Sequence, residues 1–180
     1  PLALLILATG RLEIPDPSSV FGLALLLVCF LLGLVRLSGV TVLAPVALGC
    51  VLALAWTWHE RHFSADSPMI PLAWYVGFYV LFTAFPFVFR ARLVGRTWPW
   101  IAAAAAGPGF FSLVYRLVSQ SWPNDLMGLL PAGFAMAPLC GLAFLVKYHR
   151  LDNPARLTQL ALPGMPHLVF LTLAAATAGL

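Results

Sequence analysis

Charged residues occur in a few short groups along this chain of 180 residues, and the sequence between the groups is almost continuously apolar. A helix needs roughly 20 mostly apolar residues to cross the hydrocarbon core of a bilayer. The pattern therefore predicts an all-α polytopic transmembrane helix bundle with one partial N-terminal span, residues 1–9, and six full spans. The full spans are predicted at residues 20–35, 39–58, 70–89, 98–118, 126–146 and 157–180.

Composition supports the same fold class. Hydrophobic residues make up 62% of the chain and charged residues 9%, whereas soluble domains average about 45–50% and about 25%. A water-soluble surface cannot be built from so few polar residues, so the excess apolar side chains must face lipid. We expect one transmembrane helical region over residues 1–180. Both ends lie in apolar sequence, so we expect this region to be a segment of a longer chain.

The loops between the predicted spans differ in charge from one side to the other. Cytoplasmic loops of membrane proteins collect Lys and Arg. One side carries seven basic residues: Arg36, Arg90, Arg92, Arg96, Lys147, Arg150 and Arg156. The other side carries Arg11, Arg61 and Arg116, with the acids Glu13, Asp16, Glu60, Asp66 and Asp125. The asymmetry predicts a multi-pass protein of the cell inner (cytoplasmic) membrane with loops 36–38, 90–97 and 147–156 in the cytoplasm.

Tryptophan, proline and small residues refine this prediction. The six tryptophans lie near predicted helix ends, where an indole suits the headgroup layer. Kinks are expected where prolines fall in or near the spans, at Pro45, Pro86, Pro108, Pro131, Pro138, Pro163 and Pro166. The short connection at 36–38 predicts an antiparallel hairpin. Small residues four apart, such as Ala103 and Gly107, predict a face on which helices pack closely.

Arg116 is the first candidate for a functional residue, because a charge near membrane depth is costly and tends to face a cavity or a partner. Asp125 follows it on the same predicted side and is the expected partner. One interpretation is a substrate site in which Arg116 faces an anionic substrate from an outer vestibule. The other is a structural ion pair, with the Arg116 side chain extending to the outer interface.

Histidines supply the remaining candidates. His59 and His62 flank Glu60, and this spacing holds a metal where a helix continues through it, although the motif is not HExxH. The alternative is a pair of polar loop residues at the outer surface. His167, inside the last predicted span, is a candidate ligand of haem or chlorophyll, or else a packing histidine. Both pigments stay open, and the sequence predicts no cofactor.

Common catalytic signatures are absent from the sequence. No P-loop, GxSxG or GxGxxG motif occurs, and no pair of acids lies inside the predicted spans. We therefore predict no enzyme and no catalytic residue. The formal charge of +4 is scattered between apolar runs, which argues against nucleic-acid binding.

Three phrases carry a resemblance to a known family: WYVGFY with FPF at residues 74–87, WPWIAAAAAGPGFFSLVYRL, and YHRLDNPARLTQLAL. Over residues 71–162 the chain resembles the large multi-pass bacterial membrane proteins of a domain-of-unknown-function family. The resemblance implies a longer polytopic chain, and it carries over no functional residue. Beyond Leu162 the sequence departs from the family pattern.

Two functions follow as hypotheses. The first is a non-enzymatic subunit or scaffold that packs against other membrane subunits, or against further helices of the same chain, within membrane lipids. The second is a transporter or transport-related protein that uses Arg116. A pigment-binding bundle built on His167, His59 and His62 is a third possibility.

Overall fold

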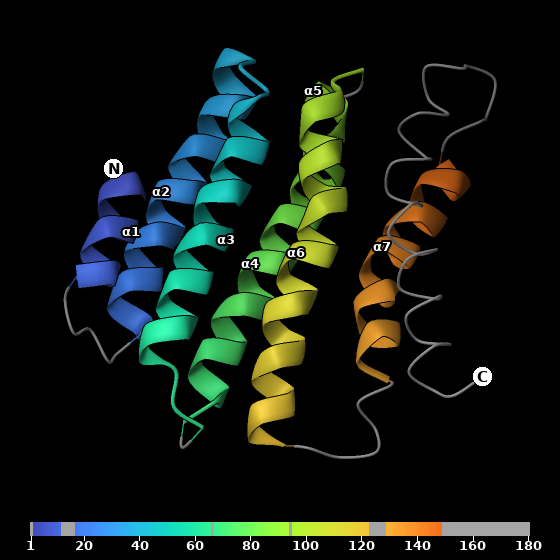
Figure 1. Cartoon of the computed structure of the whole chain (residues 1–180). Coiled ribbons are helices and arrows are strands. Elements are labelled where there is room, and N and C mark those ends of the chain that lie inside the picture. The colour runs from blue at the N-terminus through green and yellow to red at the C-terminus, as the bar shows by residue number, and fades with distance from the viewer. Residues whose placement is uncertain (1, 12–16, 66, 94, 123–128, 149–180) are drawn as a thin grey trace.

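The computed structural model describes residues 2–11, 17–65, 67–93, 95–122 and 129–148. Every regular element in these ranges is a helix, and the long helices lie side by side (Figure 1). In chain order the helices are α1 (Leu2–Arg11), α2 (Pro17–Ser38), α3 (Leu43–His62), α4 (Met69–Val88), α5 (Arg90–Leu93), α6 (Thr97–Ser121) and α7 (Leu129–Tyr148). The predicted all-α class is confirmed.

Four of the described helices are long and apolar enough to cross a membrane: α2, α3, α4 and α6, with 22, 20, 20 and 25 residues. The prediction of six full spans is therefore not supported, because four helices meet these requirements in the described part of the chain. Helix α7 lies where the span 126–146 is predicted, and the predicted span 157–180 lies outside the described residues. Helix α1 corresponds to the partial span 1–9.

Several of the helices have a proline in their first turn. It is the third residue of α3, α4, α6 and α7, at Pro45, Pro71, Pro99 and Pro131. The first-turn amides of a helix have no intrahelical acceptor, so proline is tolerated there. Pro45 and Pro131 therefore lie in first turns, where the kinks expected of them are not required. Pro86 and Pro108 lie inside α4 and α6, while Pro163 and Pro166 lie outside the described residues.

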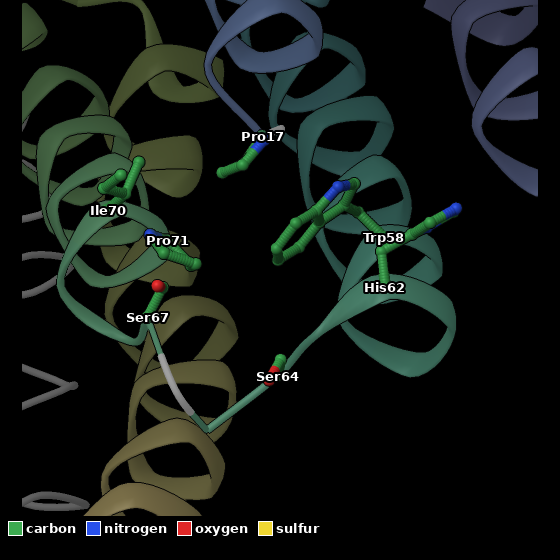
Figure 2. A pocket seen from close by; sticks show the side chains of 7 residues that line it. All are labelled: Pro17, Trp58, His62, Ser64, Ser67, Ile70 and Pro71. Atoms are coloured by element: carbon green, nitrogen blue, oxygen red, sulfur yellow. The ribbon is translucent and has the colours of Figure 1, made fainter. Parts of the chain in front are cut away.

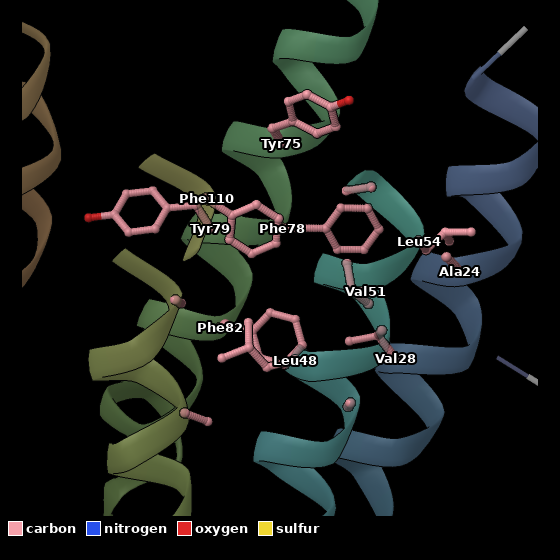
Figure 3. Close-up of a cluster of buried hydrophobic side chains, with 14 of the residues drawn as sticks. Ala24, Val28, Leu48, Val51, Leu54, Tyr75, Phe78, Tyr79, Phe82 and Phe110 are labelled. Carbon is pink, nitrogen blue, oxygen red and sulfur yellow. The ribbon is translucent and has the colours of Figure 1, made fainter. Parts of the chain in front are cut away.

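Aromatic and aliphatic side chains from several helices meet in the centre of the bundle (Figure 3). Phe78 of α4 stacks on Phe110 of α6 with their ring centroids 6.4 Å apart. Two of the tryptophans expected at the lipid interface, Trp58 and Trp100, are instead buried. Helices gain little from the hydrophobic effect in lipid, so close packing of such side chains must hold the bundle together.

The small residues of α6 pack against other helices of the same chain. Ala103 and Gly107 are both buried, and the most extensive contact of α6 is with α4. Two residues after Gly107, α6 contacts α3, because a Cβ atom at Gly109 would lie 2.7 Å from Cδ1 of Leu52. Ala103 and Gly107 thus lie in a packed part of the bundle, and the close backbone approach expected of them stays a prediction.

The turn between α2 and α3 lies at the same end of the bundle as α5 (Figure 1). Gly39 in this turn has a φ of 76°, which glycine adopts without strain. The guanidinium of Arg96 donates a hydrogen bond to the Gly39 carbonyl, and Arg36 lies 4.7 Å from the ring centroid of Phe89. The antiparallel hairpin of α2 and α3 is confirmed, and its turn is joined to the α5–α6 connection.

Candidate functional site

Arg116 lies near the end of α6, opposite the last turn of α3, where it forms an ion pair with Glu60. Nη1 of Arg116 contacts Oε1 of Glu60, and Nη2 lies 3.5 Å from Oε2. The two side chains are 43% and 48% exposed. The guanidinium thus joins two helices that are far apart in the sequence.

Trp56 provides a second contact for the same guanidinium. The Cζ atom of Arg116 lies 5.6 Å from the centroid of the Trp56 ring, which is within cation–π range. Trp56 and Glu60 are four residues apart on α3, so both side chains lie on one face of the helix. Arg116 is therefore held by an aromatic ring and a carboxylate from a single helix, and its charge is neutralised.

His59 is buried beside this ion pair and has 4% of its surface exposed. Its Nδ1 lies 3.4 Å from the hydroxyl of Tyr75 on α4, and its ring stacks on Phe63 with centroids 4.5 Å apart. The side chain of Gln120 on α6 also interacts with the imidazole. The interpretation of His59 as a surface loop residue is wrong, because α3 continues four residues past its predicted end at Trp58 and carries His59 into the packed bundle.

His62 stacks on Trp58, with ring centroids 6.2 Å apart. Both residues line a hollow of about 370 Å³ at the end of the bundle, which we call the end hollow (Figure 2). Its other lining residues are Pro17, Ser64, Ser67, Ile70 and Pro71. His59 and His62 thus stack on different aromatic neighbours. Within the part of the chain that the structure describes, no group of three or more His, Cys, Asp or Glu side chains could hold a metal ion.

Two of the candidate residues, Asp125 and His167, lie outside the described residues. The pairing of Arg116 with Asp125 and the role of His167 as a haem or chlorophyll ligand therefore stay predictions. Glu60 was missed as the partner of Arg116, although the charge pattern placed both residues on the same predicted side. That shared side was the signal available in the sequence.

The chain was compared with protein-family models, curated proteins and solved structures, and none of them matches it. The resemblance to the family of unknown function over residues 71–162 thus stays a prediction. Function must be argued from the residues themselves. In this site the charged and polar groups of α3, α4 and α6 contact one another across helix boundaries.

Proposed function

We propose that this chain is a non-catalytic membrane subunit or scaffold, whose helices pack with other membrane subunits or with further helices of the same chain. The proposal rests on the polar side chains, because these contact one another between helices. Arg116 is bound by Glu60 and Trp56, and His59 contacts Tyr75. These contacts connect helices and leave no free nucleophile or acid pair among the groups that form them.

The exposed face of α7 is the surface on which we place the partner helices. Gly133, Met136, Cys140 and Ala143 are exposed and repeat every three or four residues, so they share one face. Three of these four residues are small, which allows the backbone of a second helix to approach closely. The exposed face of α2, with Leu26 and Phe30, is bulkier and suits contact with lipid tails.

The orientation we propose places the Arg36 and Arg96 end in the cytoplasm of a bacterium. Arg36 lies in the last turn of α2, Arg90 and Arg92 lie in α5, and Arg96 contacts the α2–α3 turn. Glu60 and Arg116 pair at the far ends of α3 and α6. Short loops that are rich in Lys and Arg stay on the cytoplasmic side of the membrane. The basic end would then also face anionic lipid headgroups.

The proposal is tested by photo-crosslinking in the native membrane. A benzoylphenylalanine placed at Met136 on α7 is compared with one at Leu26 on α2, since both positions are exposed and apolar. We expect a discrete protein adduct from position 136 and lipid adducts alone from position 26. A chain that migrates near its own mass of 19.4 kDa with both probes, and has no partner in native mass spectrometry, contradicts the scaffold role.

A transporter is the alternative, and one observation favours it. The Arg116 side chain keeps 43% of its surface exposed, so an anionic substrate could compete with Glu60 for the guanidinium. Transport also needs a water-filled path through the bundle. Thr83 of α4 is buried, and the variant Thr83→Cys reports on such a path. Reaction of the introduced thiol with a membrane-impermeant reagent supports transport, and an unreactive thiol at this position supports the scaffold.

A further inference from the structure

A second hollow, which we call the seam groove, lies between α2 and α4. It has a volume of about 320 Å³. Its lining residues are Leu25, Trp74, Gly77, Phe78, Val80 and Leu81. Unlike those of the end hollow, the described residues that line it carry hydrocarbon and aromatic side chains and include no serine or histidine.

The end hollow and the seam groove lie in succession along one face of α4. Ile70 lines the first, and Trp74, Gly77 and Leu81 line the second. Residues spaced by three or four positions lie on the same side of a helix. The two hollows are therefore parts of one lengthwise surface.

Helix α2 forms the matching side of the seam. Pro17 lines the end hollow and Leu25 lines the seam groove, with Phe21 between them at four-residue spacing. Phe21 is fully buried, and its ring centroid lies 5.7 Å from that of Trp58 and 6.2 Å from that of Phe78. Phe21 thus lies between the two hollows along α2 and is packed beneath the surface that joins them.

Polarity changes along this surface as it does along a lipid molecule. The end hollow offers the hydroxyls of Ser64 and Ser67 and the imidazole of His62, whereas the seam groove is apolar. Eleven residues of helix separate Ile70 from Leu81, which corresponds to about 16 Å. Half of the hydrocarbon core is about 15 Å thick. The distance along the two hollows therefore matches the depth of one leaflet.

We infer that the α2–α4 seam binds one glycerophospholipid, with its headgroup in the end hollow and one acyl chain in the seam groove. The inference rests on the membrane location proposed above. The groove of about 320 Å³ is lined by apolar side chains, which suit contact with a hydrocarbon chain. A flexible acyl chain fits, and His62, Ser64 and Ser67 provide hydrogen-bonding groups for the phosphate and glycerol oxygens.

A larger side chain at Gly77 would fill the groove. No atom outside its own helix lies within 4 Å of a Cβ built at Gly77, and the same is true at Gly49 on α3. The Cβ of Gly77→Leu therefore has open space, and its side chain extends from a residue that lines the groove; Gly49→Leu is the matched control outside the seam. Both replacements favour helix formation.

The experiment uses the full chain in nanodiscs of phosphatidylethanolamine that carries a diazirine midway along one acyl chain. We expect the crosslinks to concentrate on the peptides around Leu25 and Gly77–Leu81. Gly77→Leu should lower the yield at these positions at least about fivefold, and Gly49→Leu should leave it unchanged. Equal yields in the two variants overturn the inference, and so does a wild-type crosslink map spread evenly over the exposed face of α2.

The headgroup end is tested separately by native mass spectrometry. We expect wild type to retain phosphatidylethanolamine in preference to a diacylglycerol with the same chains, and His62→Phe, which keeps the stacking on Trp58, to lose about fivefold of that preference. A wild type that retains both lipids equally overturns the placement of the headgroup. Extraction of the protein from membranes by carbonate alone contradicts the membrane location itself, whereas an integral protein with an evenly spread crosslink map contradicts only the lipid site.

Discussion

The hydroxyl of Tyr79 on α4 donates a 2.7 Å hydrogen bond to the backbone carbonyl of Phe134 on α7. In a regular helix this carbonyl would accept a hydrogen bond from the amide of residue 138. Residue 138 is proline and has no amide hydrogen. Tyr79 therefore supplies, from a neighbouring helix, the donor that Pro138 removes, as buried carbonyls in lipid require.

Tyr79→Phe removes this donor while preserving the ring stacked near Phe134, whose centroid lies 4.7 Å away. We expect the free energy of unfolding in detergent micelles to fall by about 1–2 kcal/mol, because a buried carbonyl is left unpaired. The decisive control is the background Pro138→Ala, which restores a backbone donor. In that background Tyr79→Phe should cost clearly less, and an equal cost in both backgrounds contradicts the coupling of Tyr79 to the proline.

Gly109 provides a second prediction about helix packing. A Cβ at this position would lie 2.7 Å from Cδ1 of Leu52, whereas Gly77 has open space around the same position. Gly109→Ala should therefore leave the protein less stable than Gly77→Ala by about 1 kcal/mol, at the low end of the cost of overpacking, because the side chain of Leu52 must move. The denaturation midpoints of the two variants measure this difference in stability. Leu52→Ala should remove most of the difference, and its persistence would show that Leu52 is not the cause.

The ion pair between Arg116 and Glu60 should contribute little on its own, because both side chains are nearly half exposed. We expect a coupling energy below about 1 kcal/mol from the cycle of Glu60→Gln and Arg116→Gln, decreasing as salt is added. Arg61→Gln, an exposed neighbour on the same helix turn, is the matched control and should show no coupling to Arg116. A larger coupling that is insensitive to salt would indicate that the pair is shielded from solvent in the intact membrane.

The order and position of the described helices follow from the sequence because composition and spacing determine them. Apolar runs between charged groups gave each long helix to within a few residues, as for α4, predicted at 70–89 and found at Met69–Val88. Contacts between helices have no such local signal. Glu60 lies far from Arg116 in sequence, and nothing near either residue indicates how α3 and α6 rotate toward each other. The burial of His59 likewise depends on α3 continuing past Trp58 to His62.

Topology provides the last prediction, because the proposed orientation assigns each end of the bundle to one side of the membrane. Leu37, at the end of α2, and Ala65, between α3 and α4, are both exposed and lie at opposite ends. In a background without the free cysteines Cys29, Cys50 and Cys140, an impermeant maleimide should label Ala65→Cys on intact spheroplasts and Leu37→Cys only after lysis. We expect this result because the proposed orientation places the Arg-rich end, with Arg36 and Arg96, in the cytoplasm. Labelling of Leu37→Cys on intact spheroplasts, with Ala65→Cys protected, reverses the orientation and moves the end hollow from the outer leaflet to the inner one.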